Sequence, residues 1–370
     1  MNKKFTIFGE ENIEKEALDQ FHAVLEQEEV KQAALMPDAH LGYCAPIGSV
    51  FALEGKISPV LCGMDIGCGM CACPTSFDVG DVGDNRDEIL ESIYKYVPVG
   101  FSIHQKEQKW RFERMMEKAS DAAKEVFVKR KARQQLGTLG TGNHFIEVGF
   151  DDDGVVWIIV HSGSRGFGHG VASHYMREGH PEGKLNNDYS AFHVDEELGK
   201  QYAADLNICL RYALDNRYYI IRRTAHAIYK VVGKGFYNLD KMINRNHNHA
   251  ELYDDWWIHR KGATHAEAGM DGVIPGNMRD GSFIVEGLGN EKSLYSSSHG
   301  AGRVLGRKQA KKTLNVDDFK HTMAGISAKV DESTLDESPF AYKDIFEVMD
   351  QQKELVKVVT HVKPIINAKG

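Results

Sequence analysis

Histidine is the residue whose placement first suggests chemistry in this chain of 370 residues. Several of its 17 histidines stand in short segments rich in glycine or polar residues, namely MPDAH, GTGNHF, VHSGSRGFGH, NRNHNH and SSSHGAGR. A single histidine in such a segment is more often a hydrogen-bonded structural or surface residue. Five such segments together indicate a site, because loops that follow strands are where binding and catalytic groups are commonly placed.

The segment MDIGCGM combines a carboxylate and a thiol three residues apart, Asp65 and Cys68. Gly67 and Gly69 let the backbone turn so that both groups can face one point. Sulfur, imidazole and carboxylate ligands together favour a transition metal such as Zn, Mn, Fe or Co over Ca or Mg. The alternative is that Cys68 is a small buried apolar residue, as free cysteines often are.

Further ligands for such a metal would come from His144, His161 and either His247 or His249. The run HFIEVGF, the turn DDDG and the run VVWIIV predict two strands joined as a hairpin. In that hairpin His144 precedes the first strand and His161 follows the second, so both would lie at the same end. The glycine-serine loop after His161, with Arg165, could bind a phosphate, although such loops are common without a ligand.

SSSHGAGR is the most specific single segment. His299 is followed by a glycine-rich turn and then by RVLGRKQAKK, which predicts a helix with two arginines. We expect His299 to lie near the N-terminus of this helix, where the helix dipole keeps the imidazole neutral and able to attack phosphorus. The alternative is an ordinary turn that carries a surface histidine.

The composition limits the class of protein. Fifty-three acidic residues against 45 basic ones give a formal charge of −8, so any polyanion must be bound by a local patch or by metal ions. With 42% hydrophobic and 26% charged residues, the chain is typical of a soluble globular protein. No apolar stretch approaches the roughly 20 residues of a membrane helix. The N-terminal segment lacks the apolar core of a signal peptide, which predicts a reducing cytoplasm for the six cysteines.

The order of the predicted elements indicates the fold class. The first eighty residues carry short apolar runs broken by glycine and proline, which predict strands and tight loops rather than helices. Helices are predicted at 84–96, 107–135 and 196–232, and strands return at WWIHR, GVIPG and SFIVEGL. This mixture predicts an α+β fold, with mixed sheets and helices on the outside. Since no repeat or linker interrupts the chain, residues 1–370 are predicted to form one domain with a central cleft for metal and nucleotide.

Nine segments, in order, resemble the successive blocks of the RtcB family of RNA-splicing ligases. They are MPDAHLGYCAPIG, MDIGCG, LGTLGTGNHFIEV, HSGSRGFGH, HRKGAT, VIPGNM, SSSHGAGR, ESPFAYKDI and KPIINAKG, from residue 36 to residue 370. The resemblance implies an enzyme of tRNA splicing or RNA repair that uses GTP and two Mn(II) ions. Such an enzyme joins RNA ending in a 2′,3′-cyclic phosphate or 3′-phosphate to RNA with a 5′-hydroxyl, through a histidine-GMP intermediate.

The resemblance also implies roles for particular residues. One Mn(II) would be bound by Asp65, Cys68 and His144, and the other by Cys68, His161 and His247, so that the Cys68 thiolate bridges both ions. His247 matches better than its neighbour at 249 because the family ligand is followed by asparagine. The residue that becomes guanylylated would be His299. The guanylate pocket would be formed by Asn143, Glu147, Asn277, Ser282, His299, Gly300, Ala301, Gly302, Tyr342 and the penultimate Lys369.

RNA is the partner that the resemblance implies, with Arg165 and Arg307 matching arginines that bind RNA phosphates. An archease-type activator protein is a further expected partner, and no membrane is expected. The family segment PG(S/D)MGTxS stands here as PGNMRDGS, so contacts to the guanylate are expected to differ around Asn277. The chain is also short for the family, which suggests a specialised substrate such as damaged RNA.

Two other functions compete with this interpretation. A metal-dependent phosphodiesterase or phosphatase that opens cyclic phosphates would need the metal ligands but neither His299 nor Lys369. A non-catalytic RNA-binding or metal-storage protein predicts a basic surface, and the net charge of −8 counts against it.

Overall fold

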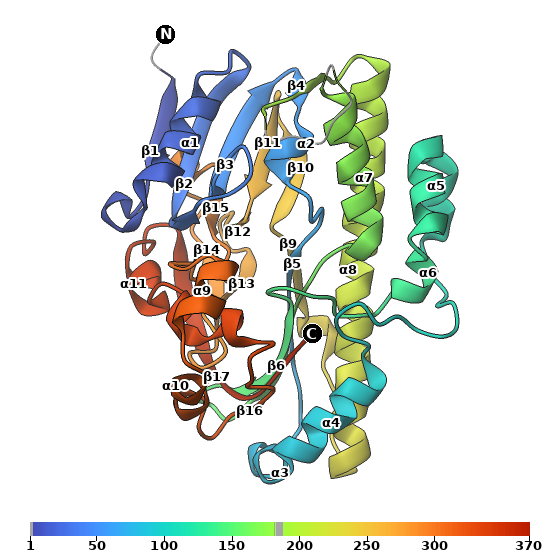
Figure 1. The fold of residues 1–370 in the computed structure, drawn as a ribbon, viewed down its shortest axis with the longest axis vertical. Coiled ribbons are helices and arrows are strands. Elements are labelled where there is room, and N and C mark those ends of the chain that lie inside the picture. The colour runs from blue at the N-terminus through green and yellow to red at the C-terminus, as the bar shows by residue number, and fades with distance from the viewer. Residues whose placement is uncertain (1–2, 181, 183–187) are drawn as a thin grey trace.

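The computed structural model describes residues 3–180, 182 and 188–370, and two large β-sheets form its centre (Figure 1). The five-stranded sheet has the strand order β1-β2-β3-β11-β10, in which only β1 and β2 run parallel. Its strands are β1 (Lys4–Ile7), β2 (Val30–His40), β3 (Ile47–Glu54), β10 (Asn248–Tyr253) and β11 (Trp256–Lys261).

The eight-stranded sheet has the order β13-β14-β17-β6-β7-β5-β9, and β16 pairs with β17 beside this path. Its strands are β5 (Gly69–Pro74), β6 (Phe145–Phe150), β7 (Val156–Ser162), β9 (Ile243–Asn246), β13 (Asp271–Pro275), β14 (Ser282–Gly287), β16 (Ser327–Ala328) and β17 (Val356–Lys369). Two short pairs complete the strands: β4 (Lys56–Ile57) with β8 (Phe192–His193), and β12 (Ala263–His265) with β15 (Ser296–Ser298).

Helices lie on both sides of the strands, and α7 and α8 run side by side along one edge (Figure 1). The helices are α1 (Lys15–Leu25), α2 (Pro59–Cys62), α3 (Val79–Asp84), α4 (Arg86–Tyr96), α5 (Asp121–Lys129), α6 (Ala132–Gln135), α7 (Arg165–Glu178), α8 (Glu197–Val232), α9 (Arg307–Thr313), α10 (Val316–Thr322) and α11 (Ile345–Asp350). The longest is α8, which packs on β5, β7 and β9 and ends at Gly233, where a left-handed backbone is easiest for glycine. Within the described residues, no helix is both long and apolar enough to cross a lipid bilayer.

Three antiparallel pairings bring distant segments to one end of the eight-stranded sheet. β6 pairs with β7, β7 with β5, and β5 with β9. The starts of β5 and β6 therefore lie beside the ends of β7 and β9. The segments that carry Cys68, His144, His161 and His247 all reach this end of the sheet.

The α+β prediction is confirmed, as are the hairpin of β6 and β7 and the long helix α8. The prediction that the first eighty residues contain no helix is wrong, because α1 forms there. Its buried residues Ala17, Phe21, Val24 and Leu25 recur at helical spacing, and the Phe21 ring packs 5.4 Å from that of Phe51 in β3.

The helix predicted over 107–135 is also wrong as a continuous element. A 3-10 helix (Glu113–Lys118) is followed by α5 and α6 as separate pieces. Ser120 ends the first piece and starts α5, because its hydroxyl accepts a hydrogen bond from the backbone N–H of Ala123. Lys131, with φ of 53°, then separates α5 from α6.

Candidate functional site

Five side chains from the strand ends converge on one buried centre. Cys68 Sγ lies 3.4 Å from His144 Nε2 and 3.1 Å from His161 Nε2. Asp65 Oδ2 is 3.0 Å from His144 Nε2, and the Nε2 atoms of His161 and His247 are 3.2 Å apart. These atoms form two ligand sets that share Cys68, one with Asp65 and His144 and one with His161 and His247. The structure thus brings together all five residues expected to hold metal.

The protonation states of these groups fit metal binding. Burial, with the neighbouring imidazoles, holds the pKa values of His161 and His247 well below the usual range, so both rings are neutral and can donate a lone pair. Burial raises the pKa of Asp65, but its contact with His144 outweighs this and lowers the pKa to about 2. Burial raises the pKa of the Cys68 thiol, and a bound cation is what would turn this thiol into a thiolate. Neutral imidazoles, a carboxylate and a thiol are a suitable donor set for Mn(II) or another transition metal.

The outer nitrogens of two rings are fixed by backbone carbonyls. His144 Nδ1 lies 3.0 Å from the carbonyl oxygen of Leu139, and His161 Nδ1 lies 3.1 Å from that of Asn143. These contacts with the carbonyls orient each ring so that its Nε2 faces the centre. His249, the alternative to His247 from spacing alone, lies elsewhere, since its Nε2 is 3.3 Å from Arg260 Nη1.

Sequence reasoning missed Arg217, a fully buried residue of α8 that supports this centre. Its guanidinium donates hydrogen bonds to the carbonyl oxygens of Gly67 at 2.7 Å and Ser162 at 2.8 Å. It also donates to the side chains of Asn244 and Asn246, each at 2.7 Å. Three of these four partners are direct chain neighbours of candidate ligands. No local motif marks Arg217, because its partners come from three separate segments: the turn before β5, the end of β7, and β9.

His299 follows β15 and lies beside the metal centre, with its ring centroid 4.8 Å from that of His247. The prediction that His299 lies at a helix N-terminus is wrong, because α9 begins only at Arg307. The glycine-rich segment between them is irregular, with bends at 299–300 and 304–305 and a positive φ of 75° at Gly302. The helix dipole therefore does not act on this imidazole.

Asp38 of β2 contacts His299 instead. Its Oδ2 lies 2.7 Å from His299 Nδ1 and accepts the backbone N–H groups of His299 and Gly300, each at 3.2 Å. Burial raises the pKa of Asp38, but the adjacent His299 outweighs this and keeps the pKa below its usual value. With Nδ1 facing the carboxylate, Nε2 of His299 is the nitrogen left for bonding. Asp38 stands in the MPDAH segment, yet only the fold places it against a residue 261 positions away.

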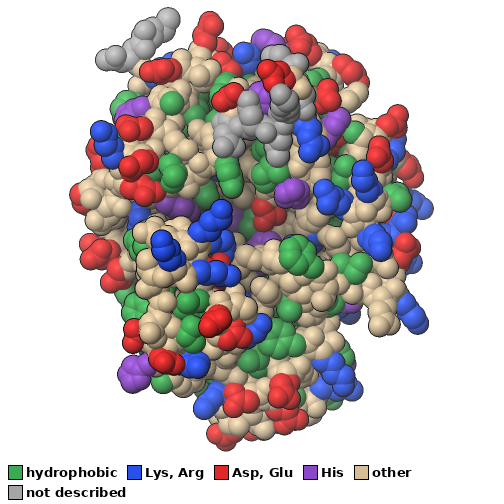
Figure 2. Space-filling model, viewed as in Figure 1, with side chains coloured by type: hydrophobic (Ala, Val, Ile, Leu, Met, Phe, Trp, Pro, Cys, Tyr) green, Lys and Arg blue, Asp and Glu red, His purple; other side chains and the backbone are tan. Residues whose placement is uncertain are grey.

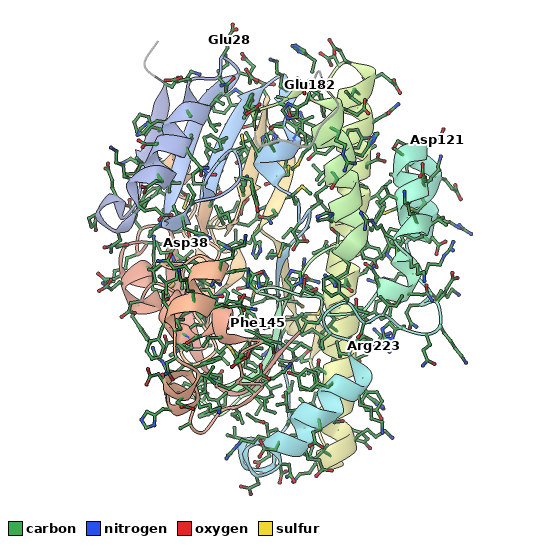
Figure 3. The ribbon with its side chains drawn as sticks, viewed as in Figure 1. Glu28, Asp38, Asp121, Phe145, Glu182 and Arg223 are labelled. Carbon is green, nitrogen blue, oxygen red and sulfur yellow. The ribbon has the colours of Figure 1, made fainter. Side chains whose placement is uncertain are left out.

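A cavity on one side of His299 collects most of the residues expected to hold guanylate. Figure 2 shows histidine side chains around a hollow in the middle of this face, and in Figure 3 Asp38 and Phe145 approach the region from β2 and β6. The expected residues that line the cavity are Asn143, Asn277, His299, Gly300, Ala301, Gly302, Tyr342 and Lys369. Glu147 and Ser282 are not in its wall. They lie next to each other in the sheet interior, where burial raises the pKa of Glu147 to about 8.

Glu337, a buried residue that sequence reasoning missed, contacts the cationic and phenolic side chains that line this cavity. Glu337 forms an ion pair with Lys369 and contacts Arg303 at 3.2 Å and Arg307 at 2.5 Å. It also accepts the hydroxyl of Tyr342 at 2.8 Å. Although burial raises its pKa, the Lys369 and arginine charges outweigh this and lower the pKa to about 2. The motif ESPFAYK contains Glu337, but its partners could not be found from spacing.

A second cavity opens on the other side of His299, above the metal centre. Asp65, Cys68 and His247 line it, together with the buried Lys261, whose pKa is lowered to about 8 by burial. His299 lines both cavities. The imidazole therefore faces two cavities, one beside Asp65, Cys68 and His247 and one that Tyr342 and Lys369 line.

The two arginines expected to bind RNA border the loop 139–143. The guanidinium of Arg165 packs against Gly140, where a Cβ atom would come within 2.1 Å of it. Arg307 lies near Gly142, and its Nη1 donates to Asp336 at 2.7 Å. Both arginines are thus close to the centre, and Arg307 is already paired with carboxylates.

Comparison with known proteins identifies the family. The model of the RtcB family, described as tRNA-splicing ligase RtcB, matches residues 20–370. The chain is 36% identical over 368 residues to RNA-splicing ligase RtcB1 of Escherichia coli strain ATCC 25922, covering 92% of this chain and 90% of that protein. It is 35% identical over 368 residues to RNA-splicing ligase RtcB of Escherichia coli K12, again covering 92% of this chain and 90% of that protein. It is 31% identical to tRNA-splicing ligase RtcB of Pyrobaculum aerophilum, covering 91% of this chain and 87% of that protein. The chain therefore belongs to the RtcB family.

Proposed function

We propose that this chain is a GTP-dependent RNA ligase that joins 2′,3′-cyclic phosphate or 3′-phosphate RNA ends to 5′-hydroxyl ends, acting as one catalytic domain. The observation that carries the proposal is the position of His299, which lines both the cavity that Tyr342 and Lys369 also line and the cavity over the candidate metal ligands. The names of the relatives support an RNA substrate in tRNA splicing or repair.

His299 is the residue that would accept GMP. Its Nε2 attacks the α-phosphorus of GTP, so that a P–N bond forms while the P–O bond to pyrophosphate breaks. Asp38, 2.7 Å from Nδ1, orients the ring and stabilises the positive charge that develops on it. Lys369 and Tyr342 bind and orient the nucleotide in the cavity.

The GMP group then moves to RNA. An oxygen of the RNA 3′-phosphate attacks the phosphorus of GMP and displaces His299, after which the 5′-hydroxyl attacks the RNA 3′-phosphorus and GMP leaves. Two Mn(II) ions held by Asp65, Cys68, His144, His161 and His247 would neutralise phosphate charge and promote opening of the cyclic phosphate. Arg165 and Arg307 are proposed to bind the RNA phosphates.

The test is transfer of label from α-³²P GTP to the protein in the presence of Mn(II). We expect an acid-labile label that is lost in His299→Ala and kept in His321→Ala, an exposed histidine of α10 that serves as the matched control. A label that survives His299→Ala would contradict the assignment of this residue.

RNA with defined ends separates ligation from simple end processing. The proposed ligase seals a 3′-phosphate end to a 5′-hydroxyl end only with GTP, whereas a phosphodiesterase or phosphatase would open or remove the phosphate without GTP and without His299. Addition of an archease-type protein to the same reaction tests whether an activator raises turnover. The free state of all six cysteines supports the proposal that the enzyme works in the cytoplasm.

A further inference from the structure

A second cluster of imidazole and carboxylate groups lies on β10 and β12, outside the Cys68 centre. His249 and Glu251 are two residues apart on β10, so they project from the same face of this edge strand. His265, the last residue of β12, packs its ring on that of His249, with centroids 4.8 Å apart and an angle of 20° between the planes. Glu251 Oε1 is 4.0 Å from His249 Nε2 and 3.7 Å from His265 Nδ1.

The charges around this cluster suit a cation. Glu251 and Glu267 bring two carboxylates, and Arg260 is the guanidinium that contacts both. The two carboxylates and the guanidinium sum to one net negative charge, and His265 Nδ1 lies 2.9 Å from Glu267 Oε1. In addition, Glu267 Oε2 is buried without a hydrogen-bond partner among the described residues.

We propose that His249, Glu251 and His265 bind a divalent transition-metal ion, with Zn(II) preferred. Two imidazoles and one carboxylate are a ligand set that Zn(II) uses with a fourth position left for water or another ligand. Bonds of roughly 2.0–2.1 Å at tetrahedral angles place ligand atoms about 3.4 Å apart. Glu251 Oε1 is 4.0 Å from His249 Nε2 and 3.7 Å from His265 Nδ1, and ligand atoms of the three residues lie within 4.8 Å of one another, so binding an ion requires the three side chains to move closer together.

Arg260 occupies the same position when no ion is bound. Its Nη1 contacts Glu251 and lies 3.3 Å from His249 Nε2, so it satisfies the two groups that the ion would take. The rest of the guanidinium is held separately, by Ser296 Oγ at 2.8 Å and the carbonyl oxygen of Leu294 at 3.4 Å. Only one nitrogen must therefore move aside. This competition makes the proposed site weaker than the Cys68 centre.

The ion would join two segments that lead into the proposed active site. β10 begins immediately after His247, a candidate ligand of the Cys68 centre. β12 pairs with β15, in the register His265 to Ser296, and β15 leads directly to His299. A cation that links His249 on β10 with His265 on β12 would thus act as a cross-link that stabilises the relative positions of His247 and His299. The site itself does not depend on the ligase activity.

Zn(II) stoichiometry of the full-length protein tests the proposal, measured by equilibrium dialysis and elemental analysis. We expect wild-type protein to bind one ion per chain more than either His265→Ala or Glu251→Gln. His265 and Glu251 are partly exposed, so both variants should fold. The control His321→Ala should match wild type. Equal stoichiometry in wild type and in both variants would overturn the proposal.

Co(II) distinguishes the two centres by their spectra. A centre that contains Cys68 gives a thiolate-to-cobalt charge-transfer band, whereas the proposed site has only nitrogen and oxygen ligands and gives visible d–d bands alone. We expect Cys68→Ala to lose the charge-transfer band and to keep d–d absorption that disappears when His265→Ala is added. If Cys68→Ala shows no d–d absorption, or if that absorption survives the addition of His265→Ala, the proposed site is not formed.

Discussion

The metal side of this site, around Cys68, and the nucleotide side, around Glu337, differ in the charges of their side chains. On the metal side, neutral imidazoles and the Cys68 thiol gather at strand ends, and backbone carbonyls and Arg217 hold the segments that carry them. On the nucleotide side, Lys369 and two arginines surround the single carboxylate of Glu337. The first group carries little positive charge of its own, whereas the second is rich in cations that are already paired.

This difference shows how one small region can bind both a cation and a polyanion. A buried set of donors gains from a metal ion because the cation binds Nε2, thiol and carboxylate atoms that otherwise contact only one another at this centre. A paired cation network exposes its positive charge only when phosphate competes with Glu337. Each prediction below changes one side or the junction between the two.

The largest effect is expected from Cys68→Ala, because Cys68 belongs to both candidate ligand sets. RNA ligation should fall by about 10³-fold or more, since metal stabilisation of phosphate charge is worth several kcal/mol. Ligation assays and bound Mn(II) measure the effect. Cys71→Ala is the matched control, as Cys71 is also fully buried in β5 but belongs to neither set. Equal losses in the two variants would mean that packing, and not metal binding, explains the loss.

Asp38→Asn should act on the junction between the two sides. We expect the rate of GMP transfer to the protein to fall by about 10²-fold, because the amide no longer stabilises the charge that develops on His299. The Mn(II) content should stay at the wild-type level, since Asp38 contacts neither candidate ligand set. Loss of bound Mn(II) in this variant would show that the two sides are not independent.

Glu337→Gln should change the acid stability of the nucleotide side. The pKa of Glu337 is lowered from 4.5 to about 2, so its ionised form stabilises the fold above pH 4.5, and this contribution is lost as the pH falls toward 2. The shift corresponds to about 3 kcal/mol. The free energy of unfolding in urea should therefore decrease less for the variant than for wild type between pH 5 and 2.5. Parallel curves would contradict the assigned role of the carboxylate.

Asn277→Ser is expected to have the smallest effect. The side chain of Asn277 accepts the backbone N–H groups of Arg279 and Asp280 and donates to the Asp280 carboxylate, so it mainly holds its own loop. We expect the KM for GTP to change by about twofold, as for a change of roughly 0.5 kcal/mol. Asn143→Ala is the comparison variant, because Asn143 lines both cavities and should give a clearly larger change.

Much of the fold class and of the candidate ligand set could be predicted from the sequence. The spacing of Asp65 and Cys68 and the hairpin that joins His144 to His161 are local features, and the structure places all four side chains at one centre. The helix expected beside His299 was wrong, because Gly302 turns the chain before a helix can begin. Local spacing indicates which groups can meet, but it does not determine where a glycine-rich segment goes.

The sequence by itself determined which chemical groups are present and which of them share a strand end, because hairpin pairing follows from a short turn. Only the tertiary structure decided that Asp38 faces His299, that Glu337 pairs with Lys369 and that Arg217 links β7, β9 and the turn before β5. These contacts join residues far apart in the chain. They form because the sheets and α8 bury polar groups that must then find partners, and burial on that scale is a property of the whole fold.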